Sequence, residues 1–376
     1  MGNKRQSGAV SIFSVVFSAL LLTVLTVGFI GLMISGQQRA INNDLSQSAY
    51  DASLAGVEDA KRVVRACLGG SSQACQALEA SDDCSVISRA GVVGGVGDEE
   101  TTIRSVSSSG EQFDQAYTCV NINMNTPDYR DEVREGSSRI VPLRATGDFN
   151  QVIIEWYTQD DAGEATPAAR PTPPSVPIES LPIPGAWSAA APPLVRAQLI
   201  TPGASYSLTS LDDSAASQTV FLRPSTVAAG STELIVPVSG LARATNQDEA
   251  TNQPTPVSCS RNFANNAHSC RVILELDATV SRADSVNALL RLNTIYKTAN
   301  VRVSLALDGS SVMFYGVQPL VDSTGRANDL FRRVEARLMV GDDFPYPSYG
   351  VDVENDLCKN FSVSDSGVVN PSACTP

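Results

Sequence analysis

Residues 9–34 read AVSIFSVVFSALLLTVLTVGFIGLMI, a run of 26 residues without a charged side chain. The uncharged stretch extends from Arg5 to Arg39, and Lys4 also precedes it. A helix needs about 20 apolar residues to cross the hydrocarbon core of a bilayer, whereas a cleaved secretory signal has an apolar core of about 7–15. The run therefore predicts a membrane-spanning helix, and the basic residues before it predict a cytoplasmic N-terminus.

The helical pattern continues beyond the apolar run. Small and apolar residues recur at steps of three and four, among them Ala49, Ala52 and Gly56, while polar residues occupy the other faces. Gly69-Gly70 is a suitable end for the helix. We therefore expect one rod over residues 9–66, about 87 Å long at 1.5 Å per residue. A plain single-pass anchor followed by a stalk helix would show a similar pattern.

The junction before the run reads QSGAVSIF over residues 6–13, so that a short basic leader ends in Gly8. It resembles the class III signal of type IV pilins. Residues 49–60, AYDASLAGVEDA, look most like minor pilins of the PilX and GspK kind. The resemblance covers residues 1–66. It implies that a prepilin peptidase removes the leader, residues 1–8, and methylates the new N-terminus at Ala9.

The chain departs from the major pilins at Phe13, the fifth residue of the expected mature chain. Major pilins carry Glu at this position. The family resemblance implies that this carboxylate meets the N-terminal amine of a neighbouring subunit, since a charge inside lipid is costly unless it is paired. A subunit without it resembles GspK-like members at the filament tip. We expect this chain to contact other pilins through Ala49, Ala52 and Gly56. The alternative is a non-pilin anchor.

The composition argues against several classes of function. Forty acidic and 27 basic side chains give a net charge of −13, which argues against nucleic-acid binding. His268 is the only histidine, so His-rich metal sites and Ser/His or Cys/His catalysis are not expected. The sequence contains no recognisable catalytic constellation. We predict a protein that is not an enzyme and has no metal ion or cofactor.

Eight cysteines lie on the outward side of the predicted membrane helix, which favours disulfides over metal sites. No C-x-x-C pair occurs among them. Their short separations predict the local bridges Cys259–Cys270 and Cys358–Cys374, and the second resembles the C-terminal disulfide loop of many pilins. The other four can pair in three ways that the sequence does not distinguish. They are Cys67, Cys75, Cys84 and Cys119.

Beyond the helix, alternation of apolar and polar residues predicts half-buried antiparallel strands. The clearest case is residues 301–307, whereas residues 330–340 fit a helix as well and are predicted as a strand. The other predicted strands are 138–144, 151–157, 194–200, 218–223, 232–238, 274–280 and 311–316. The sequence thus predicts an α+β fold. A long pilin-like helix, half membrane-inserted and half amphipathic, precedes a disulfide-bonded antiparallel β-rich domain.

Nine prolines within residues 166–193 favour extended chain. This segment is either a linker between two modules or, in the interpretation we prefer, a long insertion between strands of one sheet. Trp187 and Leu181 supply apolar groups that could dock an insertion. The outer part is accordingly divided into residues 67–165, the Pro-rich segment and a β-rich part over residues 194–376.

Several short motifs are weak indicators of a site. Residues 44–48 spell D-x-S-x-S, a metal-binding sequence of von Willebrand A domains, but they fall on the predicted helix. Residues 94–97 are Gly-rich without the Lys of a phosphate loop. His268 is interpreted as an exposed loop residue. Three acidic pairs match no EF-hand spacing and are interpreted as solvated, namely residues 82–83, 212–213 and 342–343.

With the resemblance, these features predict a minor pilin-like subunit of a type IV pilus or related filament, at or near its tip. Its expected partners are other pilin subunits, the pilus assembly machinery, the prepilin peptidase and the membrane. We expect a single-pass protein of the inner (cytoplasmic) membrane that later reaches the cell surface in the pilus. The runner-up is a membrane-anchored surface adhesin or binding protein, and an exported hydrolase lacks the usual residues.

Overall fold

The computed structural model describes residues 7–79, 84–94, 100–103, 114–163, 184–188, 191–203, 217–225, 235–238, 254–260 and 267–340. The chain divides into two compact units. Unit 1 comprises residues 1–126 and 314–340, and unit 2 comprises residues 127–313 and 341–376. The chain therefore leaves unit 1 for unit 2 and later returns to complete the first sheet.

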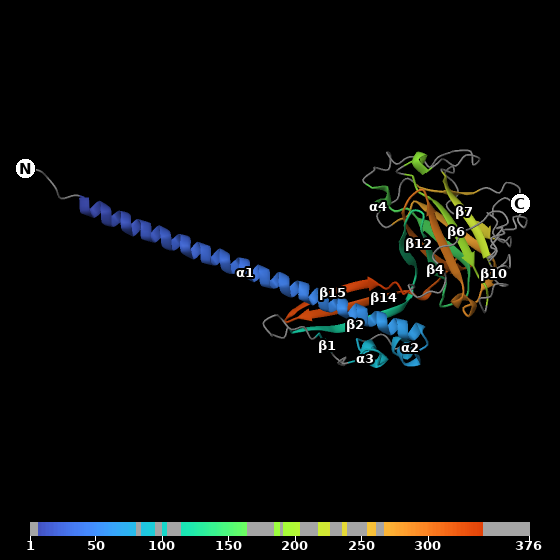
Figure 1. Cartoon of the computed structure of the whole chain (residues 1–376), viewed down its shortest axis with the longest axis horizontal. Coiled ribbons are helices and arrows are strands. Elements are labelled where there is room, and N and C mark those ends of the chain that lie inside the picture. Colours follow the sequence, from blue (N-terminus) through green and yellow to red (C-terminus); the bar gives the residue numbers. More distant parts are fainter. Residues whose placement is uncertain are drawn as a thin grey trace, which may run out of the picture. The chain divides into compact units, whose positions relative to one another are not determined.

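Unit 1 is built on α1 (Ser7–Leu68), one continuous helix of 62 residues (Figure 1). Two glycines follow it, and Gly70 adopts a positive φ of 99°. The N–H of Gly70 donates to Cys67 O at 2.9 Å, and the N–H of Ser71 donates to Ala66 O at 2.9 Å. These two bonds form a Schellman cap, which glycine allows because it has no Cβ. The predicted helix is confirmed and is slightly longer at both ends.

The second half of α1 lies along a four-stranded sheet (Figure 1). The strand order is β1 (Thr101–Thr102), β2 (Gln115–Thr126), β14 (Phe314–Ala327) and β15 (Leu330–Arg337). Every neighbouring pair is antiparallel. Two short helices, α2 (Ser72–Glu79) and α3 (Val86–Ala90), follow α1. Segments from both ends of the sequence thus build one sheet against one helix.

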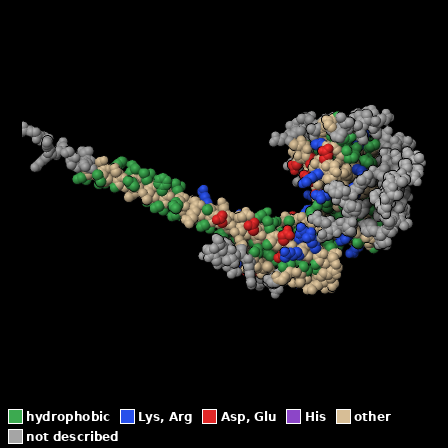
Figure 2. All heavy atoms as spheres, in the orientation of Figure 1, with side chains coloured by type: hydrophobic (Ala, Val, Ile, Leu, Met, Phe, Trp, Pro, Cys, Tyr) green, Lys and Arg blue, Asp and Glu red, His purple; other side chains and the backbone are tan. Residues whose placement is uncertain are grey.

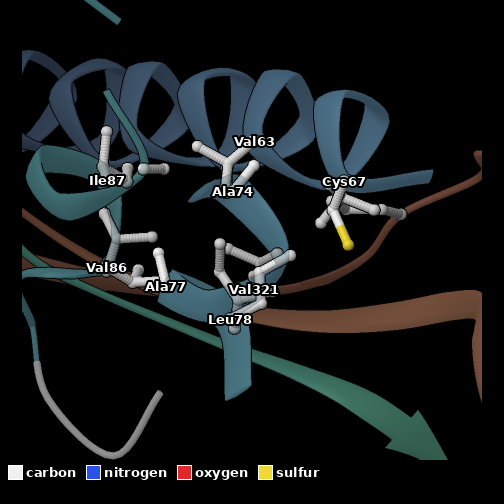
Figure 3. Close-up of a cluster of buried hydrophobic side chains, with 14 of the residues drawn as sticks. Val63, Cys67, Ala74, Ala77, Leu78, Val86, Ile87 and Val321 are labelled. Atoms are coloured by element: carbon white, nitrogen blue, oxygen red, sulfur yellow. The ribbon is translucent and has the colours of Figure 1, made fainter. Parts of the chain in front are cut away.

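The core of unit 1 lies between α1, the two short helices and the sheet. Figure 3 shows Val63 and Cys67 pointing away from the α1 axis toward Ala74, Leu78 and their neighbours. Most of these side chains are small, so the backbones approach closely. The buried cluster comprises Val57, Ala60, Val63, Val64, Cys67, Ala74, Ala77, Leu78, Val86, Ile87, Ala90, Tyr117, Val120, Ile122, Met124, Val321 and Leu338.

Unit 2 contains two sheets among its described residues. The six-stranded sheet has the order β13-β12-β5-β10-β8, and β3 also pairs with β12. Val152, Ile154 and Trp156 of β5 are buried, as alternation along a strand requires. The strands are β3 (Tyr129–Val133), β5 (Phe149–Trp156), β8 (Ile235–Val238), β10 (Cys270–Val280), β12 (Ala299–Leu307) and β13 (Ser310–Val312).

The second sheet of unit 2 is five-stranded, in the order β4-β11-β6-β7-β9. Its strands are β4 (Ser138–Pro142), β6 (Leu194–Ile200), β7 (Ser217–Ser225), β9 (Thr255–Ser258) and β11 (Leu289–Ile295). A short helix, α4 (Gln159–Ala162), and two 3-10 turns, η2 (Pro184–Ala186) and η3 (Asp284–Val286), lie between strands in the sequence. The structure therefore has the predicted α+β layout of a long apolar helix and disulfide-bonded β-rich parts.

Most predicted strands are confirmed, including 194–200 and the ambiguous 330–340, whose described strand is β15. Two features were not predicted. Strands β1, β2, β3, β9 and β11 and most of β14 were missed. Two strand pairs are parallel, β8 with β10 and β7 with β9, where only antiparallel pairing was expected. Parallel neighbours need a crossover connection, which the alternation pattern of a single strand does not reveal.

The predicted division of the outer part is corrected. Residues 166–193 fall within unit 2 and do not separate the two units, whose boundaries lie at 126/127 and 313/314. The strands on either side of this segment, β5 and β6, belong to different sheets rather than to one. Leu181 lies outside the described residues, but Trp187 is buried and stacks on Tyr296 with ring centroids 4.3 Å apart. The described end of the segment is thus docked on unit 2.

Candidate functional site

The first half of α1 carries its apolar side chains into open space. All the large apolar residues from Ile12 to Ile34 are exposed, and Phe13 is 78% exposed. Figure 2 shows this half of the helix covered by hydrophobic side chains with no chain packed on it. Such a surface is unfavourable in water. It is long and apolar enough to cross a membrane, the one such segment among the described residues, and this fits a single-pass membrane protein.

The processing residues predicted from the sequence, Gly8 and Ala9, lie in the first turns of α1. The helix continues without a break from these residues through the apolar run to Leu68. Phe13 lies in the same continuous segment. The structure thus places the expected leader junction at the start of the helix that holds the membrane-spanning segment.

One glycine in α1 and one glycine in β14 allow the helix to touch the sheet. A Cβ at Gly325 of β14 would overlap the carbonyl oxygen of Ala49 and the amide nitrogen of Ser53. A Cβ at Gly56 would overlap Ser323 Oγ and lie 2.9 Å from Val120 Cγ2. The helix and the sheet backbones therefore touch, which only the absence of side chains at these two positions allows.

This contact corrects the role predicted for the small-residue face. Ala49 and Ala52 are 0% and 1% exposed, because β14 of the same chain covers them, and Gly56 lies against Ser323. The three residues are therefore not available to a neighbouring subunit in this structure. The small residues were recognised as a site of close backbone approach, but the partner is the sheet of unit 1. No local sequence pattern matches residues so distant along the chain.

Two polar contacts fix the helix at either end of this contact. Tyr117 Oη donates to Asp59 Oδ2 at 2.8 Å, and Arg332 Nε donates to Ser46 Oγ at 2.8 Å. Burial, with the neighbouring Asp59 carboxylate, raises the pKa of Tyr117 well above its usual range. Tyr117 therefore remains protonated and can donate at every physiological pH. These contacts fix the register of α1 on β2 and β15.

Three disulfides join the described cysteines. Cys259–Cys270 forms as predicted, and the four N-terminal cysteines pair as Cys67–Cys75 and Cys84–Cys119. The first of these links the end of α1 to α2, and the second links the segment before α3 to β2. Cys358 and Cys374 lie outside the described residues, so their bridge stays a prediction.

A row of charged side chains crosses the six-stranded sheet of unit 2. Arg302 of β12 lies opposite Arg130 of β3 and Glu155 of β5, and Glu155 lies opposite Arg271 of β10. Arg302 Nε donates to Glu155 Oε2 at 2.5 Å, and Arg271 Nε lies 3.9 Å from Glu155 Oε1. The hydrogen bond to Glu155 raises the pKa of Arg302. The row ties four strands together and presents no nucleophile.

His268 lies beside this charged row and is partly buried, not exposed as predicted. Burial lowers its pKa, although the Glu155 carboxylate opposes this shift. Its Nδ1 is buried without a hydrogen-bond partner among the described residues. Neutral histidine is therefore favoured near neutral pH, and no nucleophile or metal ligand is paired with it in the described structure.

The weak motifs gain no support as sites. Residues 44–48 lie on α1, as expected from the sequence, and not on a loop after a buried strand. The acidic pairs 82–83, 212–213 and 342–343 lie outside the described residues, as do residues 95–97 of the Gly-rich stretch. Where the chain is described, no group of three or more His, Cys, Asp or Glu residues is arranged to hold a metal ion.

Comparison with known proteins assigns no family to this chain. No family model, no curated protein and no solved structure matches it. The candidate site is therefore α1 itself, with its exposed apolar half and its glycine contact on the sheet. Sequence reasoning missed Gly325 and Ser323, although a glycine inside a strand is a known sign of close backbone approach.

Proposed function

We propose that this protein is a minor pilin-like subunit of a type IV pilus or related filament. One observation carries the proposal. A single unbroken helix has an exposed apolar half that can enter a membrane, and its other half packs on an antiparallel sheet. An ordinary anchor requires only the first half. In a pilin-like subunit the same helix serves twice, first in the membrane and then in the helical bundle of the filament.

The leader and the apolar run support the same proposal. The Gly8/Ala9 junction supplies the cut expected of a class III signal, and Lys4 and Arg5 favour a cytoplasmic N-terminus. The parts of units 1 and 2 that follow the apolar run would then lie outside the cytoplasm, where their disulfides are stable. Phe13 supplies no carboxylate for a neighbouring subunit, which supports a place at or near the tip.

Because β14 covers Ala49, Ala52 and Gly56, the surface that meets other subunits must lie elsewhere on α1. The apolar half from Ile12 to Ile34 is exposed on all sides. Tyr50 and Leu54, one turn apart on the second half, are also exposed at 43% and 37%. These residues replace the three small ones as the proposed contact with the helices of neighbouring pilins.

The deciding experiment is analysis of the mature N-terminus in the source organism. Protein purified from membranes should begin at Ala9 and carry a methyl group. Gly8→Val should leave the full-length chain in the membrane, because the family's peptidase requires a residue without a side chain at the cut. Gly28→Val is the matched control, since a Cβ at Gly28 meets no atom within 4 Å. It should be processed normally.

An adhesin held by an ordinary membrane helix is the alternative outcome. It would keep Met1, and Gly8→Val would have no effect on its mass. Mature protein starting near Ala40 would instead indicate a cleaved secretory signal. Either result would remove the main support for the pilin proposal while leaving the fold of both units as described.

A further inference from the structure

The turn between β14 and β15 lies at the end of unit 1 that faces the apolar half of α1 (Figure 1). Three contacts establish this direction. Leu68 lies beside Gly316, Gly56 beside Ser323, and Ala49 beside Gly325. Residue numbers rise along β14 as they fall along α1, so the two elements run antiparallel. The turn after Ala327 is therefore the part of this hairpin nearest to the membrane-spanning segment.

The position of the turn along α1 can be measured from Arg332, whose Nε donates to Ser46 Oγ at 2.8 Å. Ser46 follows Ile34, the last residue of the apolar run, by twelve positions, which is about 18 Å along a helix axis. The headgroup layer on each side of a bilayer extends about 5–8 Å beyond the hydrocarbon core. The turn thus lies a short distance above the headgroups if α1 stands upright.

The apolar run is long enough for α1 to tilt, and a tilt reduces the distance between the turn and the headgroup layer. Its 26 residues extend about 39 Å, whereas the hydrocarbon core is about 30 Å thick, and a helix with such an excess tilts or shifts in the bilayer. Packing and interfacial side chains set the direction of tilt. Unit 1 carries its sheet on one side of α1, so a tilt toward β15 lowers the turn into the headgroup layer.

Phe331, the second residue of β15, is 56% exposed. It pairs with Arg326, one residue from Gly325, so its side chain lies on the sheet face opposite α1. Phe is one of the apolar residues that interfacial segments bury at the headgroup boundary of a bilayer. Of the three arginines nearest the ring, Arg333 pairs with Asp322 and Arg326 with Asp114 and Glu100. Arg332 donates to the neutral Ser46 hydroxyl, and Asp329 of the turn supplies an acidic side chain close by in the sequence. The ring, not a net positive charge, is therefore the group suited to lipid.

We propose that α1 is tilted so that Phe331 and the β14–β15 turn rest in the headgroup layer of the membrane that α1 spans. The contact holds the sheet of unit 1 against the bilayer. The partner is a lipid surface, and because acidic side chains offset the arginines near the ring, the contact does not require anionic lipid. The inference rests on α1 spanning a membrane and does not depend on assembly into a filament.

The test uses the full chain in phosphatidylcholine vesicles that contain a lipid with a nitroxide on its headgroup. Phe331→Trp places a fluorophore at the turn. Val92→Trp is the matched control, because Val92 is a 38% exposed apolar residue of unit 1 at its other end. The adjacent Gly91 lies against Gln73, beyond the C-terminal end of α1. The signal of native Trp156 and Trp187, both buried in unit 2, is subtracted with wild-type protein.

The nitroxide lipid should quench Phe331→Trp severalfold more strongly than Val92→Trp. Equal quenching of the two variants would show that unit 1 does not rest on the membrane by this turn. Quenching of Phe331→Trp that appears only after anionic lipid is added would also overturn the proposal, because the contact would then be electrostatic. A failure of Gly8 processing affects neither measurement, so the pilin proposal and this inference can fail separately.

Discussion

Gly325 lies directly against the backbone of Ala49, so β14 and α1 meet without a side chain between them. Ser53 and Ser323 beside this contact are both 0% exposed, so the interface is closed to water. Ser53 Oγ donates to Tyr50 O at 2.6 Å, within the helix itself. The closest approach of α1 to β14 therefore depends on small residues over about two turns of the helix.

The first prediction is that Gly325→Ala destabilises unit 1 and leaves unit 2 intact. The added methyl group would overlap backbone atoms of α1, which cannot move as a flexible side chain can. Overpacking of this kind costs typically about 1–3 kcal/mol. Circular dichroism should show an earlier loss of helix in denaturant. Fluorescence of Trp156 and Trp187, both in unit 2, should keep its midpoint.

Gly147→Ala is the control for this measurement. A Cβ at Gly147 would lie 4.0 Å from Val312 Cγ1, an ordinary van der Waals distance. Its unfolding curve should match the wild type by both signals. A Gly325→Ala curve that also matches the wild type would contradict the close contact.

The second prediction concerns Ala52→Arg. Ala52 is 1% exposed against the sheet, so an arginine there buries a charge without a partner and should prevent α1 from packing on β14. We therefore expect unit 1 to become sensitive to protease. If Ala52 lay on a free assembly face instead, the same substitution would leave the outer domain folded. Asp51→Arg is the matched control, since Asp51 is exposed on the next position of the helix. Resistance of the Ala52→Arg protein equal to that of Asp51→Arg would contradict this assignment.

The third prediction is the pattern of disulfides. Non-reducing peptide mapping should recover Cys67–Cys75, Cys84–Cys119, Cys259–Cys270 and the still untested Cys358–Cys374, with no free thiol. From loop-closure entropy, Cys84→Ser should lower the free energy of unfolding by roughly 4 kcal/mol and Cys75→Ser by roughly 2.5 kcal/mol. The difference arises because the Cys84–Cys119 bridge closes a longer loop than the Cys67–Cys75 bridge. Alkylation of eight thiols in native protein, or equal effects of the two changes, would contradict it.

The sequence predicted α1 because its signals are local. Apolar residues and small residues recur at helical steps without a break, and Gly69 and Gly70 supply the end. Strands with clear alternation, such as 301–307, were also predictable, since one face of each is buried. Where the local pattern and the burial agree, the sequence is sufficient to predict the helix or strand.

The missed strands show where local pattern is insufficient. Strand β2 carries asparagines at alternate positions, which favour turns, and β14 contains Gly316, Pro319 and Gly325. Their pairing with each other makes them strands, and they lie far apart in the sequence. The partner of Ala49, Ala52 and Gly56 was missed for the same reason. Small residues indicate that a backbone comes close but do not indicate which one.

The fourth prediction is a pH dependence of unit 2 that involves His268. Burial lowers its pKa in the folded state, so the unfolded chain binds the proton more readily. The stability from neutral His268 is present above its unfolded pKa of about 6.5 and is lost as the pH falls from there toward the folded value. Glu155 and Asp161 oppose the loss, whereas Arg302 and Arg130 favour it.

The measurement is the denaturant midpoint of Trp fluorescence at pH 7.5 and 5.5, which reports unit 2 because Trp156 and Trp187 both lie there. The wild-type midpoint should fall at the lower pH. His268→Gln removes the titrating group and should reduce that fall. An unchanged fall in the variant would assign the dependence to carboxylates instead.

The last prediction concerns Phe13 and assembly. The side chain of Phe13 is 78% exposed on the apolar half of α1, so it faces lipid or a neighbouring helix and carries no charge for an amine to meet. Under the pilin proposal, wild-type protein should not polymerise alone and should appear at few positions in each filament. Phe13→Glu restores the residue of the major pilins, and the variant should enter the shaft more often.

Phe17→Glu is the control, because Phe17 is also exposed on this helix, one turn later. A carboxylate at that position finds no partner and is costly in lipid. Tagged subunits are located by immuno-electron microscopy in strains that express each variant. Abundant filaments of the wild-type subunit alone, or identical labelling for the two glutamate variants, would show that position 13 does not govern entry into the filament.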